Sequence, residues 1–388
     1  MNLNLAPYYN TKLGAEIRVT GHSHQGQTKR QEDAIDVAFQ TQSDNPGDSL
    51  FAFFGVFDGH GGPEAALYVK KQLMSHITAQ SNFWSGNDSR ILKAIRDGFL
   101  SVQEAMWLER RKQALSSPSS SHRLRKHPSY PGTTATIAIL KEAKLYIGHV
   151  GNSGIVFGYQ EPGSHFWRAK QVTEEHIPDK VSERERMHRS GLAVRSMLGL
   201  PRVVSLEDVR GASSRRKANE DDFFTSSGPF LPLARSLGDL WSYSREKEDF
   251  LVSPVPDTFV VEVDSTFRCM ILATDGLWDV VSDQDAVDTV FHAERSNKIH
   301  KNERWANPSR KLVKQALREW ESRRLRADNT SVVTVVFDKV RTDGGHQDDK
   351  KLHRVSSKEE IMEQYWKALG TLFVIMAPIL IAFKMFEA

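Results

Sequence analysis

The chain is poor in cysteine, since Cys269 is the only one among 388 residues. A single cysteine can form neither an intramolecular disulfide nor a zinc-thiolate cluster, and such a composition is typical of a reducing compartment. Cys269 also lies inside the apolar run RCMILATD, where a buried thiol is a poor nucleophile. The sequence therefore argues against catalysis by cysteine, and any bound metal must use oxygen or imidazole ligands.

The chain also lacks a strong excess of charge of either sign. Its 52 basic and 49 acidic residues leave a net charge of +3, which is too small to indicate nucleic acid as a partner. With 39% hydrophobic and 26% charged residues, the composition is that of a globular protein with a sizeable core. The first residues, MNLNLAPYYN, have neither the basic start nor the apolar core of a secretory signal. We therefore expect a domain that faces the cytosol.

Long apolar runs are absent except near the C-terminus. Residues 368–383 carry no charge, Lys367 and Lys384 bracket them, and Tyr365 and Trp366 precede them. As a helix this run would span about 24 Å, less than the ~30 Å of a hydrocarbon core, but snorkelling lysines and interfacial aromatics could close the gap. We expect a C-terminal membrane anchor. A terminal helix packed on the globular body, in a cytoplasmic or nuclear protein, is the alternative.

Strand-like and helical patterns alternate over residues 15–340, which predicts an α+β fold of stacked sheets with helices outside. Three segments follow from composition: a domain over 1–340, a polar linker over 341–364 and a hydrophobic tail over 365–388. Two stretches, 116–132 and 211–228, interrupt the pattern and are predicted to be surface loops. The predicted helices cover 62–80, 89–113, 174–190, 282–293 and 308–324.

Carboxylates stand at the ends of several apolar runs. These are Glu32 and Asp33 in KRQEDAID, Asp58 in FFGVFDGHGG, Asp275 and Asp279 in ILATDGLWD, and Asp328 in RADNTSVVTVV. Each alone is more simply a solvated turn residue or a helix cap. Together they could line one oxygen-rich pocket, which suits Mg²⁺ or Mn²⁺ better than Zn²⁺. Two such ions could hold a phosphate and activate a water, and His60 could protonate the leaving alkoxide.

Six motifs, in their order and spacing, resemble those of the metal-dependent protein phosphatases, the PPM or type 2C family. They are FDGHGG, GTTA, HVGNSG, LARSLGD, ATDGLWD and ADNTSVV, and the resemblance covers residues 17–337. The stretch FLPLARSLGDLWSY, with a basic insert before it, looks most like the DNA-damage-induced subgroup. The resemblance implies a sandwich of two antiparallel β-sheets with helices outside and a site at one end between the sheets. It also implies a serine/threonine phosphatase that acts on phosphorylated proteins, and we expect a monomer.

The resemblance assigns roles to residues at matching positions. Asp58 would bridge two Mg²⁺ or Mn²⁺ ions with help from the Gly59 carbonyl, and His60 would be the general acid. Asp275 would bind one ion and Asp328 the other. Glu32 and Asp33 would hold metal-bound water or the metal itself, and Asp279 belongs to a weaker third site.

Two positions depart from the family pattern. Thr28 stands where the family has its phosphate-binding arginine, so Lys29 and Arg30 become the candidate phosphate ligands. Asn152 replaces the aspartate of the third metal site, and an amide oxygen is a poorer Mg²⁺ ligand than a carboxylate. These departures leave open a catalytically impaired relative that serves as a scaffold or binding module. A two-metal phosphodiesterase or nuclease is a weaker alternative, and Arg235 could either pair with a buried acid or bind substrate.

Overall fold

The structure is a computed structural model that describes residues 2–5, 7–10, 12–41, 49–116, 131–197, 200–205, 231–299 and 305–339. The chain divides into units 1–340 and 341–388, and every described residue belongs to the first. Several predicted segments lie outside the described residues. They are the linker over 341–364, the tail over 365–388, the loop over 211–228 and most of the loop over 116–132. Within the described ranges, no helix combines the length and the apolar character needed to cross a bilayer.

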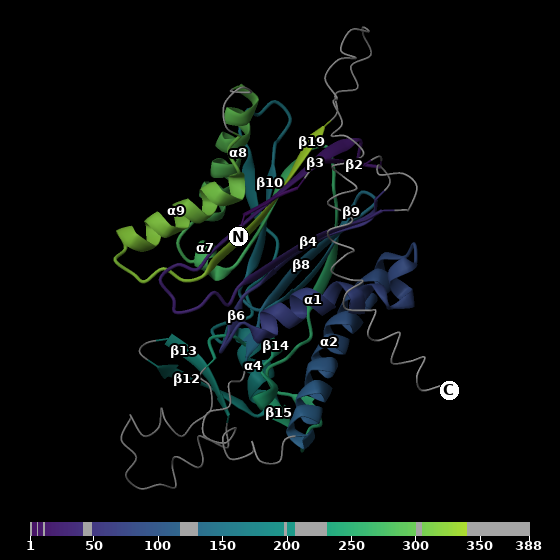
Figure 1. Cartoon of the computed structure of the whole chain (residues 1–388), viewed down its shortest axis with the longest axis vertical. Helices are drawn as coiled ribbons and strands as arrows, with labels where there is room; N and C mark the ends of the chain where they lie inside the picture. Colours follow the sequence, from purple (N-terminus) through teal and green to yellow (C-terminus); the bar gives the residue numbers. More distant parts are fainter. Residues whose placement is uncertain are drawn as a thin grey trace, which may run out of the picture. The chain divides into compact units, whose positions relative to one another are not determined.

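Two antiparallel sheets form the centre of this unit (Figure 1). The first has the order β1 (Asn2–Asn4), β3 (Ala15–His24), β19 (Thr330–Lys339), β18 (Phe267–Ala273), β10 (Gly154–Tyr159) and β11 (Arg168–Gln171), and β2 (Tyr8–Asn10) also pairs with β3. The second has the order β17 (Asp257–Glu262), β9 (Lys144–Val150), β8 (Ala135–Lys141), β5 (Ser49–Phe57) and β4 (Ala34–Thr41). The predicted α+β class is confirmed.

Helices cover the outer face of each sheet. Helices α1 (Glu64–Thr78) and α2 (Asp88–Ser116) pack on the five-stranded sheet, and α8 (Asp283–Ile299) and α9 (Pro308–Ser322) on the other. The alternation of side chains along a strand explains this layering. On β5, Phe53 and Phe57 enter the cluster under α1 and α2, whereas Phe54 and Val56 enter the cluster between the sheets.

A smaller group of elements follows β11 and has its own apolar core. It contains α4 (Val181–Ser190), the hairpin of β12 (Leu192–Met197) and β13 (Leu200–Ser205), and the pair β15 (Tyr243–Ser244) and β16 (Asp249–Phe250). Met187, Leu192, Val203 and Leu233 are buried together in this core. A short three-stranded sheet joins β6 (Gly59–His60), β7 (Gly132–Thr133) and β14 (Leu237–Gly238) from distant parts of the sequence and carries His60.

Several elements differ from the sequence prediction, among them one strand and one helix near the acidic residues. Strand β4 was not predicted, although Ile35, Val37 and Phe39 alternate with smaller or polar residues. The helix predicted over 174–190 begins only at Val181. Pro178 explains the difference, because proline disfavours helical geometry at the preceding residue and removes a backbone donor. The backbone of residues 174–180 instead forms hydrogen bonds with other loops. The His176 amide donates to the Gly151 carbonyl, and the Ala234 amide donates to the His176 carbonyl.

Candidate functional site

Strand register brings the predicted acids to one end of the two sheets. In the five-stranded sheet Ala34 pairs with Phe57, so Asp33 and Asp58 flank the same register position. In the other sheet Ala273 pairs with both Gly154 and Val332, so Asp275 and Asn152 lie just beyond paired strand ends, near the start of β19. Asp328 precedes that strand by two residues. Five separate segments of the sequence therefore meet at one edge of the sandwich.

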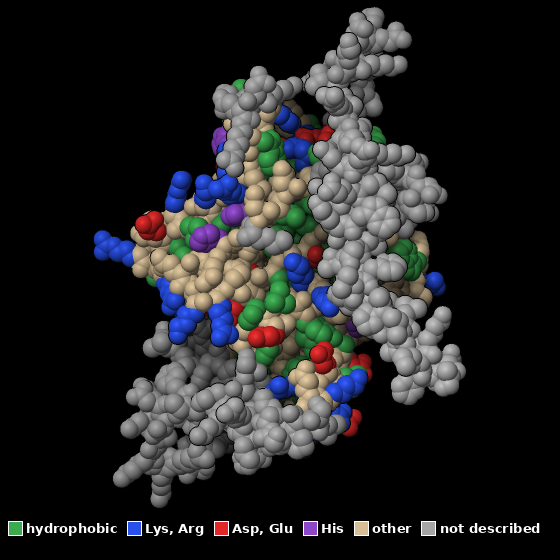
Figure 2. All heavy atoms as spheres, in the orientation of Figure 1, with side chains coloured by type: hydrophobic (Ala, Val, Ile, Leu, Met, Phe, Trp, Pro, Cys, Tyr) green, Lys and Arg blue, Asp and Glu red, His purple; other side chains and the backbone are tan. Residues whose placement is uncertain are grey.

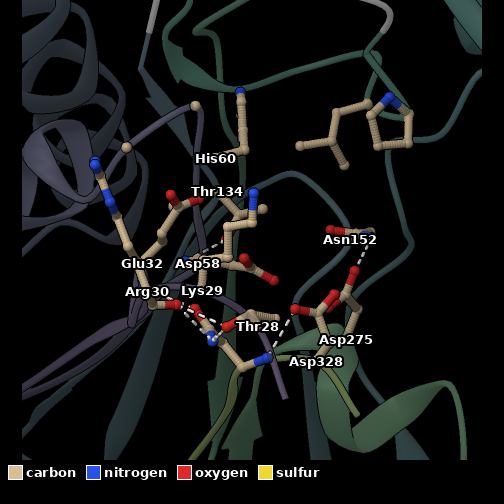
Figure 3. Close-up of a pocket in the computed structure, with 16 residues that line it drawn as sticks. Thr28, Lys29, Arg30, Glu32, Asp58, His60, Thr134, Asn152, Asp275 and Asp328 are labelled. Carbon is tan, nitrogen blue, oxygen red and sulfur yellow. Dashed lines mark hydrogen bonds between the residues drawn. The ribbon is translucent and has the colours of Figure 1, made fainter. Parts of the chain in front are cut away.

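The acids line one cavity of about 470 Å³ (Figure 3). Asp58, Asp275 and Asp328 point toward the same part of it, and Glu32 and His60 belong to its wall. Asp33 lies behind them: it is buried, its Oδ2 accepts a hydrogen bond of 3.0 Å from Thr274 Oγ1, and its Oδ1 has no partner among the described residues. Of the predicted metal ligands only Asp33 and Asp279 are outside the lining of this cavity.

The clustered carboxyls hold their protons more tightly than usual. Burial raises the pKa of Asp58 well above its ordinary value, and the neighbouring charges of Asp275 and Asp33 raise it further. Burial, followed by the charge of Asp328, also raises the pKa of Asp275, and burial raises that of Asp33 to about 7. Such crowding of acids is unfavourable without a cation, which fits a site for positive ions.

The donor set fits hard divalent cations. In the positions the side chains take here, no three Asp, Glu, His or Cys side chains of the described ranges converge as ready metal ligands. Asn152 Nδ2 instead donates to Asp275 Oδ2 at 2.8 Å. Oxygen-only ligands and a partnerless buried carboxylate oxygen at Asp33 suit a hard divalent cation, whose charge would offset the crowding that raises the carboxyl pKa values.

Gly59 is required by close packing between the segment that follows β5 and the segment that precedes β4. A Cβ atom at Gly59 would lie 2.4 Å from the Glu32 carbonyl oxygen and 3.1 Å from the Ala66 Cβ. A side chain there would push the Glu32 segment away from Asp58. The glycine therefore allows the acid-bearing segments of β4 and β5 to approach each other.

Asn329 organises the loop that carries the candidate phosphate ligands, and the sequence reasoning gave it no role. Its Oδ1 accepts from the Glu32 amide at 2.7 Å. Its Nδ2 donates to the Gln25 carbonyl at 2.7 Å, to Thr28 Oγ1 at 2.6 Å and to the Arg30 carbonyl at 3.1 Å. Thr28 thus serves the loop itself, while Lys29 and Arg30 are exposed and line the cavity. The one feature of the sequence that could have indicated a role for Asn329 is its position directly after the candidate ligand Asp328.

His60 has a buried acidic partner that the sequence reasoning also left without a role. Its Nε2 lies 2.8 Å from Asp239 Oδ2, and Asp239 is only 1% exposed. Burial lowers the pKa of His60, but the charge and hydrogen bond of Asp239 outweigh that effect, so the pKa is raised. Ser236 Oγ and Trp241 Nε1 also donate to Asp239, at 2.5 and 2.8 Å. The imidazole is thereby fixed and held toward its protonated form.

The remaining candidates fall outside the cavity. Asp279 follows the short helix α7 (Asp275–Trp278) and remains accessible to solvent, but partial desolvation of its carboxyl, followed by the charge of Asp275, raises its pKa to about 7. Arg235 pairs with buried Glu183 at 2.5 Å, which confirms the structural alternative for this arginine. Cys269 is fully buried, and burial raises the pKa of its thiol, so the exclusion of a cysteine nucleophile holds.

Comparison with known proteins gives consistent matches. The family model described as protein phosphatase 2C matches residues 17–330. "Probable protein phosphatase 2C 69" of Arabidopsis thaliana is 30% identical over 299 residues, which are 77% of this chain and 65% of that protein. "Protein phosphatase 2C homolog 2" of Schizosaccharomyces pombe is 29% identical over 70% of this chain and 60% of that protein.

A solved structure agrees with these sequence matches. The crystal structure of serine-threonine phosphatase 2C from Toxoplasma gondii has a TM-score of 0.65 and 25% identity, covering 87% of this chain and 99% of that one. The chain spans about half to two thirds of the length of the first curated relatives. The DNA-damage-induced subgroup is not tested by these matches and stays a prediction.

Proposed function

Because the chain belongs to the protein phosphatase 2C family, we propose that it is a metal-dependent protein serine/threonine phosphatase. The observation that carries the proposal is one cavity that joins Asp58, Asp275 and Asp328 with the Asp239-supported His60. A catalytically impaired scaffold is disfavoured, because the two unusual residues, Thr28 and Asn152, both form hydrogen bonds with residues of the site. Thr28 is part of the Asn329 hydrogen-bond network, and Asn152 contacts Asp275.

We assign the cation ligands to Asp58, Asp275 and Asp328, with the Gly59 carbonyl, Glu32 and Asp33 in supporting positions. Bound Mg²⁺ or Mn²⁺ would neutralise the phosphate charge and make the attacking water more acidic. Asp279 and Asn152 would contribute to a weaker third position. That the bound ion is Mg²⁺ or Mn²⁺ is itself part of the proposal.

The chain's own groups account for binding and proton transfer. Lys29 and Arg30 would bind the phosphate oxygens, since both line the cavity and neither is used by an ion pair between described residues. Water attacks phosphorus, the bond from phosphorus to the serine or threonine oxygen breaks, and the leaving oxygen takes a proton from His60. Asp239 contacts Nε2 of His60, which leaves Nδ1 to donate the proton to the substrate.

The experiment measures phosphate release from a phosphothreonine peptide by the full chain with Mn²⁺ or Mg²⁺. Asp58→Asn and Asp275→Asn are the comparison variants, and Asp88→Asn, which alters an acid on α2 that does not line the cavity, is the matched control. We expect metal-dependent turnover that both site variants lose and the control keeps. Wild-type turnover no higher than that of the two site variants would leave the scaffold alternative standing.

We further propose that residues 365–388 attach the protein to a membrane with the phosphatase domain on the cytosolic side. The support is the uncharged run 368–383 between Lys367 and Lys384. The test compares membrane pelleting of the full chain with that of a chain ending before Tyr365. Equal recovery of both in the soluble fraction would contradict the anchor.

A further inference from the structure

Helix α9 and the segment after it carry a concentrated positive charge that the proposed chemistry does not use. Residues 310–326 contain seven Lys or Arg and two Glu. Their net charge of +5 exceeds the +3 of the whole chain, so the rest of the sequence is net negative. Figure 2 shows basic side chains gathered over this part of the surface. We call Lys314, Arg318, Arg323, Arg324 and Arg326 the basic strip.

The strip is the solvent face of an amphipathic element. Leu312, Val313 and Ala316 are buried against the first sheet, while every member of the strip is exposed. Lys314 and Arg318 are four residues apart and so lie on the same helix face. None of the ion pairs between described residues includes a member of the strip. Its charge is therefore not neutralised by a neighbouring carboxylate at contact distance.

Two members of the strip are fixed in place by carbonyl groups. Arg323 donates to the Asp279 carbonyl at 3.0 Å and to the Val280 carbonyl at 2.8 Å. Arg326 Nε donates to the Gln27 carbonyl at 2.7 Å. Carbonyl partners orient a guanidinium without cancelling its charge. The positive charge therefore has a defined position at the surface.

Arg324 occupies a backbone position that normally favours glycine. It follows Arg323, the C-cap residue of α9, with a φ of +55°, in the left-handed region, where a side chain is disfavoured. Backbone strain of this kind is a reason to look for a function of the side chain. Here the Arg324 side chain, which stands at the strained position, adds another exposed cation to the strip.

The strip ends at the mouth of the catalytic cavity. Arg326 contacts Gln27, whose amide donates to the Ala327 carbonyl at 2.8 Å. The same loop continues into Lys29 and Arg30, and both line the cavity with Asp328. An extended peptide advances about 3.3–3.6 Å per residue, so residues a few positions from a bound phosphothreonine would reach the Arg326 end of the strip.

We infer that the basic strip binds acidic residues flanking the phosphorylated residue, so that acidic phosphoproteins are the preferred substrates. This inference rests on the proposed phosphatase function. A protein substrate fits better than a free nucleic acid or a membrane surface, because the strip is continuous with the loop that receives the substrate phosphate. Long-range attraction between the strip and an acidic segment also raises the rate of encounter and weakens with added salt.

The test uses two phosphothreonine peptides that differ only in flanking glutamates or glutamines, with p-nitrophenyl phosphate as a small reference substrate. The full chain should show a kcat/KM about five- to tenfold higher for the acidic peptide at low salt, falling toward equality between about 0.02 and 0.3 M salt. The triple variant Lys314→Glu, Arg318→Glu and Arg324→Glu should lose or reverse this preference. Triple reversal at Lys71, Arg90 and Arg96, exposed bases on and near α1 and α2, is the control and should keep it.

Binding of the labelled peptides without added metal separates the inference from the proposed function. Tighter binding of the acidic peptide, lost in the strip variant, supports the strip even if no peptide is hydrolysed. Hydrolysis of both peptides at equal, salt-independent rates by the wild type overturns the inference and leaves the phosphatase function intact. Strip-dependent binding of a single-stranded RNA or of phosphatidylserine vesicles, without a preference for the acidic peptide, also overturns it.

Discussion

Asp239 lies 2.8 Å from His60, although 179 residues separate the two in the sequence. The Asp239 backbone has a φ of +43°, a conformation that is uncommon for aspartate, and its carboxylate accepts from Ser236 and Trp241 as well. Two donors, Ser236 and Trp241, thus hold a buried carboxylate against the proposed proton donor His60. An acid fixed in this way orients the imidazole and stabilises its protonated form.

Asp239→Asn should slow hydrolysis of a phosphothreonine peptide by about 10- to 100-fold, because the leaving alkoxide needs a proton. Hydrolysis of p-nitrophenyl phosphate should change far less, since its leaving group is stable without one. Steady-state kcat for both substrates checks this, and Asp88→Asn is the control. An equal loss on both substrates would mean that Asp239 acts only on folding or metal binding.

Asn152→Asp should place a second carboxylate beside Asp275, in the position from which the amide now donates at 2.8 Å. Without added metal the extra repulsion should lower Tm. The concentration of Mg²⁺ or Mn²⁺ for half-maximal activity should also fall several-fold, because a carboxylate is the better ligand. Metal titrations with Asn87→Asp as the control, at the start of α2, check the prediction. An unchanged titration curve would count against a third metal position.

Asn329→Ala should release the loop that carries Lys29 and Arg30. The variant removes partners of the Glu32 amide, the Gln25 and Arg30 carbonyls and Thr28, and loss of such buried hydrogen bonds costs about 2–3 kcal/mol. KM for a phosphopeptide should rise several-fold.

Asn297→Ala is the matched control for Asn329, because Asn297 also bridges backbone groups, at Ala306. It should lower the free energy of unfolding without changing KM. A stability loss at Asn329 with unchanged KM would show that the loop's position does not matter for substrate binding.

His149 should make the protein less stable in acid. Burial, followed by the charge of His176, lowers the pKa of His149 to about 3, whereas an unfolded histidine has a pKa of about 6.5. The unfolded chain therefore binds more protons between these values. The stability from the neutral ring is fully present above pH ~6.5 and is lost as pH falls, by up to about 1.4 kcal/mol per pH unit.

Urea unfolding at several pH values checks the His149 prediction. His149→Gln should be less stable near neutral pH, since the ring contacts Thr136 Oγ1 at 2.8 Å and the Glu174 carbonyl at 2.9 Å, but it should show a flatter acid slope. His165→Gln, at an exposed position, should keep the wild-type slope. A slope that is the same in all three proteins would contradict the assignment.

The sequence predicted the acids of the site well and their supporting contacts poorly. Asp58, Asp275 and Asp328 each follow or precede a strongly apolar strand, and that pattern alone placed them at strand ends. Asn329 and Asp239 act through partners far away in the sequence, and no local pattern reports such contacts. The late start of α4 after Pro178 was readable from the proline, whereas the Gly151 and Ala234 contacts of that stretch exist only in the folded chain.

The order of strands has a consequence for synthesis of the protein. Strand β19 is the last of the first sheet in the sequence, yet it lies between β3 and β18. The Glu32 amide finds its Asn329 partner 297 residues further along the chain. A ribosome-bound chain that has not yet released residues 328–339 therefore lacks both the central strand and one proposed cation ligand. The proposed phosphatase activity should therefore appear only after residues 328–339 are free to join the sheet.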